Sequence, residues 1–291
     1  MQQLTTLLQE QRRNPRRFWQ SLRSSHSELP CALQNVQSWD TYLRDVTDVG
    51  HIEGCHLPPD AYPLQFAVDA PSLNVPISLQ EVQAGLQCLH NGRASGKTGI
   101  PAELFRYAQH PRQPGGLPEV HLLAPSLTKV LDSMFQNGIV PEFINVGLVT
   151  PVFKRGDPFQ AVNYRPITVT EPLLRLYAIV LNKRLQDYTE NNGLRAETQT
   201  GFRPGFSTTH QLFALQAFVD GSQARSVPLY TCFLDLTGAY DRVQRQLLWQ
   251  ILENLGIHGP MLIALQSLYC TSALRMRVQG RAGPLCYHRL D

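Results

Sequence analysis

The chain has 291 residues, of which 43% are hydrophobic and 17% are charged, and its formal net charge is +3. This length fits roughly two domains, and the hydrophobic fraction excludes a chain that is disordered throughout. No apolar run approaches the roughly 20 residues of a membrane helix, and the N-terminus lacks the pattern of a secretory signal. We therefore expect an intracellular protein of the nucleus or cytoplasm with no membrane partner.

The charge is distributed unevenly along the chain. Residues 1–25 have a net charge of +4, residues 26–90 of −7 and residues 91–291 of +6, and 22 of the 26 basic residues are Arg. Arg binds phosphate through a bidentate fork and stacks on bases, so this usage is compatible with nucleic-acid binding. A GC-rich genome, which favours Arg codons, explains the same usage equally well.

The first 76 residues are predicted to form a poorly ordered or helical lead-in, with a basic start at 12–19 and several prolines after residue 57. His51, Cys55 and His56 faintly resemble a metal site, but no second ligand pair follows at finger spacing. The six cysteines form no C-x-x-C pair, so no disulfide framework is expected.

Ser78 and Glu81 form a capping box that begins a helix, and Asn91-Gly92 ends it. The loop that follows, Gly92–Thr98, has three residues between its glycines where a P-loop has four, and a helix precedes it where a P-loop has a strand. The pattern therefore argues against an ATP- or GTP-binding P-loop.

A second helix is predicted over 121–137, and alternating residues then predict a strand over 146–153, in which Pro151 indicates an edge or a bulge. Residues 154–157 are predicted to form a turn. They contain Arg-Gly-Asp, the tripeptide of cell-adhesion ligands, but without a secretory signal the turn is the better interpretation. Residues 163–169 return as an extended segment. A long helix follows, with Thr170 as its cap, Pro172 in its first turn and Asn192-Gly193 at its end.

The second half of the chain contains a helix over 207–219 and a strand over 227–236, in which Cys232 is expected to be a small core residue. Helices over 246–255 and 260–270 and strands over 274–278 and 284–287 complete the chain. The predicted strand ends at Asp235 beside a turn, where a carboxylate can hold Mg²⁺ together with a backbone carbonyl. Capping of that turn by Asp235 is an equally good interpretation of the spacing.

The segment Phe233–Asp241 resembles the first catalytic motif of reverse transcriptases, and residues 91–241 as a whole resemble those of non-LTR (LINE-type) retrotransposons. Residues 91–101 are similar to the N-terminal extension motif of that family, residues 148–157 and 163–168 to its paired fingers strands, and residues 199–208 to its third motif. The match covers roughly the last 200 residues, and its motifs come in the family's order.

The resemblance implies an α+β right-hand polymerase fold, with fingers over 77–195, an incomplete palm over 196–291 and no thumb. It implies an RNA-directed DNA polymerase that uses an RNA template, a DNA primer and dNTPs, with Mg²⁺ as cofactor and Mn²⁺ as the alternative ion. Asp235 would be the catalytic metal ligand, Lys154 and Arg165 would hold the triphosphate, and Tyr240 would be the steric gate that rejects a ribose 2′-OH.

Two departures from the family pattern stand out. The family usually has an Asp where Thr98 stands, and the chain contains no Asp-Asp pair, so the aromatic-Ala-Asp-Asp motif is missing. We therefore expect a chain that is truncated before that motif and inactive by itself, since two metal ions need carboxylates from two places. The alternative is a catalytically inactive remnant that acts at most as a nucleic-acid-binding module.

Overall fold

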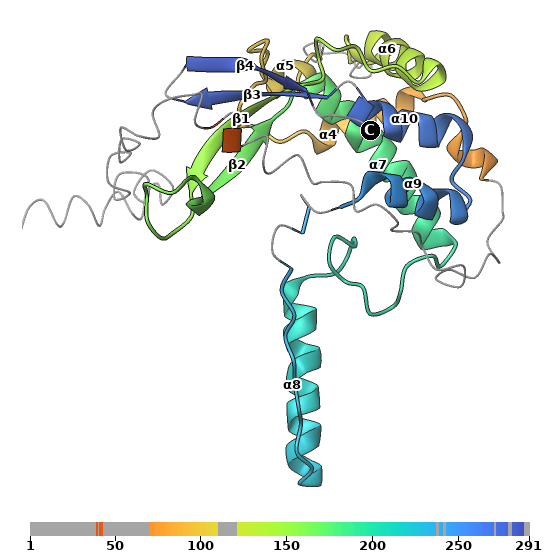
Figure 1. The fold of residues 1–291 in the computed structure, drawn as a ribbon. Coiled ribbons are helices and arrows are strands. Elements are labelled where there is room, and N and C mark those ends of the chain that lie inside the picture. The colour runs from red at the N-terminus through yellow and green to blue at the C-terminus, as the bar shows by residue number, and fades with distance from the viewer. Residues whose placement is uncertain are drawn as a thin grey trace, which may run out of the picture.

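The computed structural model describes residues 39, 41–42, 70–109, 121–236, 239–240, 243–270, 272–278 and 281–287 (Figure 1). Most of the predicted lead-in over 1–76, including the basic start and the cluster of His51, Cys55 and His56, lies outside these residues. The elements in chain order are η2 (Pro71–Leu73), α4 (Leu79–Cys88), α5 (Ala102–Arg106), α6 (Ala124–Asn137), β1 (Val146–Phe153), η3 (Ala161–Asn163), β2 (Tyr164–Val169), α7 (Pro172–Asn191), α8 (Thr208–Arg225), α9 (Arg245–Asn254), α10 (Gly259–Cys270), β3 (Ala273–Val278) and β4 (Arg281–Tyr287).

Helices α4, α6, α7 and α10 pack around one hydrophobic core, whose fully buried side chains include Leu86, Leu131, Leu176 and Met261. The predicted capping box begins α4, since the Ser78 hydroxyl accepts from the Glu81 N–H and the Glu81 carboxylate accepts from the Ser78 N–H. These two hydrogen bonds satisfy the backbone N–H groups of Ser78 and Glu81, which have no partner within the helix. The start of this helix is therefore fixed by its own sequence.

Helix α7 starts one residue later than the sequence predicts. Its N-cap is Glu171 and not Thr170, and the Glu171 side chain makes no capping hydrogen bond. The carboxylate is instead used by a distant loop, since it accepts from Thr98. The predicted cap is wrong because Pro172 disfavours the helical conformation at the residue before it, so Glu171 stays extended and the helix begins at Pro172.

The four strands form one sheet in the order β2-β1-β3-β4, with β1 antiparallel to β2, β1 parallel to β3, and β3 antiparallel to β4. Pro151 lies opposite Pro166, and β3 pairs with β1 only over Val146–Val149. The Lys154 N–H donates a hydrogen bond to the Asn163 carbonyl, so these two residues form a hydrogen-bonded pair. Hydrogen-bonded and non-hydrogen-bonded pairs alternate along antiparallel strands, so Pro151 and Pro166, three steps away, form a non-hydrogen-bonded pair. At Pro151, β1 no longer has β3 as a neighbour, so the missing N–H of this proline costs no hydrogen bond between strands. The edge position that the sequence indicates for Pro151 is therefore found.

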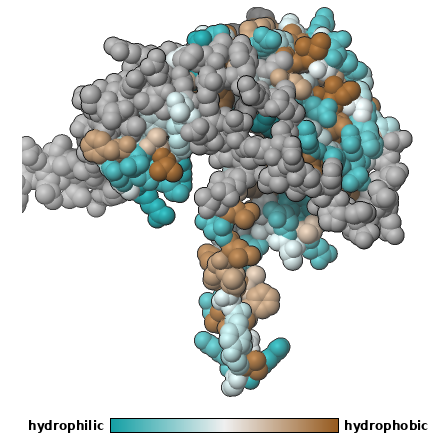
Figure 2. Space-filling view, in the orientation of Figure 1, coloured by the Kyte–Doolittle hydropathy of each residue, from teal (hydrophilic) through white to brown (hydrophobic). Residues whose placement is uncertain are grey.

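Helix α8 points away from the rest of the described structure, and the segment after it runs back alongside it (Figure 1). This helix has large exposed hydrophobic side chains, and Figure 2 shows hydrophobic surface along it, to which Leu212, Phe213 and Phe218 contribute. It extends to Arg225, six residues beyond the predicted end at Val219.

The strand predicted over 227–236 is wrong, because these residues form no strand and every one of their side chains is exposed. A strand needs a neighbouring strand to satisfy its backbone groups, and in the part of the chain that the structure describes this segment has none. For the same reason Cys232 is exposed and is not the core residue expected from the sequence.

Candidate functional site

The hairpin of β1 and β2 positions the two basic residues that the sequence singles out. Val152 lies opposite Arg165, and the Lys154 N–H donates to the Asn163 carbonyl at 2.9 Å, so the pairing continues one step beyond β1. Residues that face each other across antiparallel strands share a side, and so do residues two apart along one strand. The register therefore puts Lys154 and Arg165 on the same side of the hairpin, and both residues are exposed.

The opposite side of this hairpin is held by aromatic packing. Tyr164 is 5% exposed, its ring centroid lies 5.1 Å from that of Trp39 and 5.3 Å from that of Phe153, and both contacts are edge-on. Burial, helped by the Asp157 carboxylate, raises the pKa of Tyr164. The hydroxyl thus keeps its proton and donates to the Pro158 carbonyl at 2.9 Å. These contacts anchor the loop of the hairpin and fix the direction in which its basic side faces.

The Arg-Gly-Asp tripeptide lies in this loop and makes its turn. Gly156 has a φ of +97°, a left-handed value that favours glycine. The Asn163 side-chain amide donates to the Asp157 carbonyl at 2.9 Å and so closes the loop from its other end. The turn interpretation of this tripeptide is confirmed.

Asp235 lies on the segment that returns alongside α8 and is exposed to solvent. No group of three or more His, Cys, Asp or Glu residues that could hold a metal ion is found among the described residues. A single exposed carboxylate does not fit a complete magnesium site, which takes several oxygen ligands. The described residues therefore do not build a metal centre around Asp235.

Tyr240 lies against Phe202, with the two ring centroids 6.4 Å apart in an edge-on arrangement. Both rings are largely exposed, Tyr240 to 76% and Phe202 to 85%. Phe202 comes from the loop between α7 and α8, 38 residues earlier in the chain, so this contact joins the turn after Asp235 to that loop. The sequence predicted a role for Tyr240 but not its aromatic neighbour.

Arg203 holds this loop in place. Its guanidinium donates to both carboxylate oxygens of Glu190, at 2.9 and 2.8 Å, and its third nitrogen reaches the carbonyls of Ala196 and Gln199, both at 3.2 Å. The hydrogen bond from Arg203 lowers the pKa of the Glu190 carboxyl. A bidentate pair of this kind gives geometric specificity. The loop that presents Phe202 is therefore tied to the end of α7.

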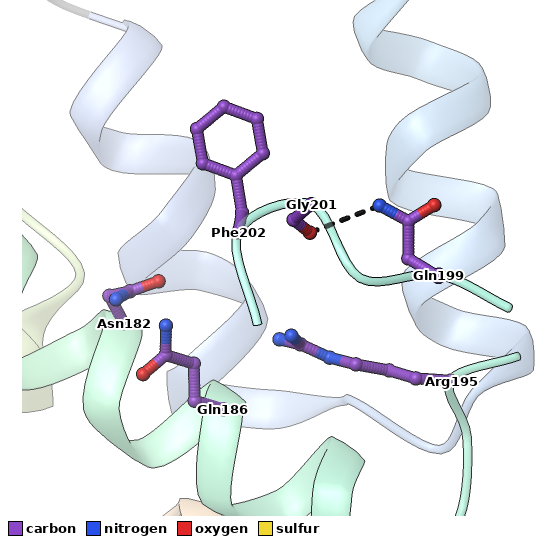
Figure 3. A pocket seen from close by; sticks show the side chains of 6 residues that line it. All are labelled: Asn182, Gln186, Arg195, Gln199, Gly201 and Phe202. Atoms are coloured by element: carbon purple, nitrogen blue, oxygen red, sulfur yellow. Dashed lines mark hydrogen bonds between the residues drawn. The ribbon is translucent and has the colours of Figure 1, made fainter. Parts of the chain in front are cut away.

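A pocket of about 440 Å³ lies between α7 and this loop, and Figure 3 shows the six residues that line it: Asn182, Gln186, Arg195, Gln199, Gly201 and Phe202. The sequence predicted none of the six as a site residue. Asn182, Gln186 and Arg195 lie in no motif segment, and Gln199, Gly201 and Phe202 lie only in the segment that resembles the third motif. Their helical spacing of four residues does put Asn182 and Gln186 on one face of α7, but it takes the fold to set the loop opposite them.

Comparison with known proteins finds a matching protein family. Residues 153–289 match the family model described as reverse transcriptase (RNA-dependent DNA polymerase). The match begins at the end of β1 and includes Lys154, Arg165, Asp235 and Tyr240. The predicted α+β class is confirmed and is compatible with a reverse transcriptase fold.

Individual relatives come from transposons. The chain is 22% identical over 219 residues to the "Transposon TX1 uncharacterized 149 kDa protein" of Xenopus laevis, which covers 75% of this chain and 16% of that protein. It is 28% identical over 123 residues to the "Probable RNA-directed DNA polymerase from transposon BS" of Drosophila melanogaster, and 25% identical over 118 residues to the corresponding protein of transposon X-element. Each Drosophila match covers 40% of this chain and 13% of the relative.

The resemblance to transposon reverse transcriptases that the motifs predict is thus confirmed, and the matches are consistent with the non-LTR type. The chain spans between 13% and 16% of the length of these relatives. No helix among the described residues is long and apolar enough to cross a membrane.

Proposed function

We propose that this reverse transcriptase segment takes part in RNA-directed DNA synthesis, in which a nucleotide is transferred from a dNTP to the 3′-OH of a DNA primer on an RNA template. The observation that carries the proposal is the family match over 153–289. The register of β1 and β2 supports it, because two basic residues on one side of a hairpin can contact one triphosphate.

The proposed roles follow the residues of the site. Lys154 and Arg165 bind the phosphates of the incoming dNTP, and Tyr240 excludes a ribose 2′-OH. Asp235 contributes one carboxylate to a divalent metal, Mg²⁺ or Mn²⁺, whose chemistry in this family is to neutralise charge on the reacting phosphate. Since the described residues do not complete that metal site, the proposal assigns Asp235 as one ligand and derives no step from it.

The proposed architecture is that of a right-hand polymerase, with fingers over 77–195 and part of the palm over 196–291. The boundary at residue 195 stays a prediction. Two structural contacts cross it: β3 pairs with β1, and α10 shares the core of α4, α6 and α7. The two segments are therefore expected to unfold together and not as separate units.

A second candidate is a nucleic-acid-binding module without polymerase chemistry. It is favoured by the net charge of +6 over residues 91–291. Both candidates predict that the chain binds a template–primer duplex in a manner that weakens steeply with salt, because phosphate neutralisation releases counterions.

Primer extension separates the two candidates. The 291-residue chain is given an RNA template, a DNA primer and Mg²⁺ or Mn²⁺, and we expect binding without extension. In a fusion of this chain to the downstream segment of the transposon BS relative, we expect extension that Asp235→Ala abolishes. Asp220→Ala, which changes an exposed carboxylate on α8, is the matched control and should leave extension intact.

Two results would contradict this assignment. Extension by the fusion that survives Asp235→Ala would remove Asp235 from the metal site. Extension by the 291-residue chain itself, lost in Asp235→Ala, would show that another carboxylate of this chain completes the site. A chain that binds no nucleic acid even at low salt would contradict both candidate functions.

A further inference from the structure

The pocket between α7 and the loop before α8 has the volume of a ligand site. Its volume of about 440 Å³ lies within the roughly 300–1,000 Å³ that is usual for small-molecule sites. Its lining contains three primary amides, one guanidinium and one aromatic ring, but no carboxylate. Figure 3 shows Asn182 and Gln186 on neighbouring turns of α7, with Arg195 extending toward them from the loop and the Gln199 amide directed to the Gly201 carbonyl.

The amide groups of this pocket are largely available. The side chains of Asn182 and Gln186 make no hydrogen bond to any residue that the structure describes. Gln199 donates from its nitrogen to the Gly201 carbonyl at 3.0 Å, which leaves its side-chain oxygen to accept. A primary amide offers two donors and one acceptor oxygen, the combination that pairs with the edge of a nucleobase.

Arg195 is held in a defined position at the pocket. Its Nε donates to the Thr189 hydroxyl at 3.0 Å, and another of its nitrogens lies 3.4 Å from a Glu190 carboxylate oxygen. Glu190 is also bound by Arg203 at 2.8 Å, so two guanidinium groups share one carboxylate. A guanidinium is a preferred partner of phosphate oxygens, so Arg195 can bind a phosphate group at the pocket.

Phe202 has a conformation that packing within the described residues does not explain. Its φ is +59°, a left-handed value that is uncommon for a residue with a bulky side chain, and its ring is 85% exposed. Such conformations are costly and are found preferentially at functional sites. The edge-on contact with Tyr240 orients the ring while leaving most of its surface open for stacking.

We propose that this pocket binds one unstacked nucleotide of a single-stranded RNA. The base stacks on the Phe202 ring, its edge bonds to the amides of Asn182, Gln186 and Gln199, and the adjoining phosphate contacts Arg195. The proposal rests on the proposed function, because it takes the RNA template as the source of the nucleotide. It adds a contact for the unpaired template beside Tyr240, at a place that no predicted site residue occupies.

The test uses the full 291-residue chain and a 12-nucleotide single-stranded RNA with one 2-aminopurine between uridines. Stacking of 2-aminopurine on an aromatic ring quenches its fluorescence, so the signal reports on the pocket while fluorescence anisotropy of an end label reports on total binding. We expect quenching by the unaltered chain. Phe202→Leu should abolish it and weaken binding by about 5- to 100-fold, the range that one base–aromatic stack provides.

Two further variants separate hydrogen bonding from stacking. Gln186→Met removes an amide at nearly constant length and should also weaken binding. The controls are Phe213→Leu, which changes a ring on α8 that is 76% exposed, and Gln83→Met, which changes an exposed amide on α4. Both controls should bind and quench like the unaltered chain.

Each other outcome contradicts the proposal. If Phe202→Leu and Gln186→Met bind and quench like the unaltered chain, the pocket is not a nucleotide site, and the proposed function stands. If the controls lose as much as the pocket variants, the effect does not come from the pocket. If the unaltered chain binds no RNA at low salt, the proposed function fails together with the inference.

Discussion

Thr98 donates two hydrogen bonds to the carboxylate of Glu171, one from its backbone N–H at 2.8 Å and one from its hydroxyl at 2.6 Å. Glu171 is 3% exposed and stands at the start of α7, so this contact attaches the loop after α4 to the helix that carries the pocket. Gly96 is part of the same contact, since a Cβ there would lie 2.6 Å from the Glu171 carboxyl carbon.

Thr98→Asp should therefore destabilise this chain, although Asp is the usual residue of the family at this position. A second carboxylate would face Glu171, and the hydroxyl donor would be lost. A hydrogen bond to a charged group contributes about 1.5–3 kcal/mol, and we expect a loss of that order in urea unfolding. Thr98→Ser keeps the hydroxyl and serves as the control. Equal stability of Thr98→Asp and the unaltered chain would show that the loop does not depend on this contact.

This contact also illustrates what the sequence could and could not predict. The capping box at Ser78 and the strand pairing around Pro151 and Pro166 depend on neighbouring residues, and the sequence predicted the helix and strands that they delimit. The hydrogen bonds from Thr98 to Glu171 join residues that are 73 positions apart, and the pocket lies between α7 and a loop that follows it. Only the folded structure brings these segments together, so the local sequence could not predict either feature. The strand expected over 227–236 failed for the same reason, because strand formation requires a partner that the segment itself cannot specify.

Arg184 connects α7 to the segment that precedes α4. Its side chain is 7% exposed, and it donates to both oxygens of Glu81 and to the carbonyls of Leu73, Val75 and Pro76. Arg184→Leu would leave the Glu81 carboxylate and three carbonyls without this donor. Removing one partner of a buried pair typically costs about 3–5 kcal/mol, so we expect a loss of that size in urea unfolding.

Lys183→Leu is the matched control for Arg184→Leu. Lys183 is the adjacent residue on α7, and its ion pair with Asp187 is exposed, with a Lys183 side chain that is 68% accessible. Exposed pairs contribute about 0–1 kcal/mol, so the control should change the free energy of unfolding little. Comparable losses in the two variants would mean that the buried network of Arg184 does not stabilise the fold.

The same network makes stability depend on pH. Burial by itself would raise the pKa of Glu81, but hydrogen bonds from Arg184 and Ser78 outweigh it and lower the pKa from 4.5 to about 2. The folded chain thus binds this proton less readily than the unfolded chain. The stabilisation is fully present above pH 4.5 and is lost as the pH falls toward 2.

Glu81→Gln should remove that part of the pH dependence. The free energy of unfolding is measured between pH 6 and pH 3, and the unaltered chain should lose about 1–2 kcal/mol more over this interval than the variant, after screening by solvent. Glu142→Gln, which changes an exposed carboxylate, is the control and should follow the unaltered chain. Parallel curves for Glu81→Gln and the unaltered chain would contradict the role of this pair.

Arg165→Ala should weaken dNTP binding, because it removes one of the two basic groups that the register puts on one side of the hairpin. In the fusion that extends primers, we expect KM for dNTP to rise about tenfold or more, since a charge-assisted hydrogen bond is worth about 1.5–3 kcal/mol. Arg155→Ala, beside Lys154 in the same loop, is the control. An increase that Arg155→Ala reproduces would indicate general charge attraction and not a specific triphosphate contact.

Tyr240→Val in the same fusion should allow incorporation of ribonucleotides. The Tyr240 ring is oriented by its edge-on contact with Phe202, and in the proposed site it fills the space that a 2′-OH would need. The measurement is the ratio of kcat/KM for a dNTP to that for the matching rNTP, which should fall at least tenfold. Tyr230→Val is the control, because Tyr230 is 90% exposed on the same returning segment and touches no proposed substrate group. If the two variants keep the same preference for deoxyribonucleotides, Tyr240 is not the gate, and its ring serves only to orient Phe202.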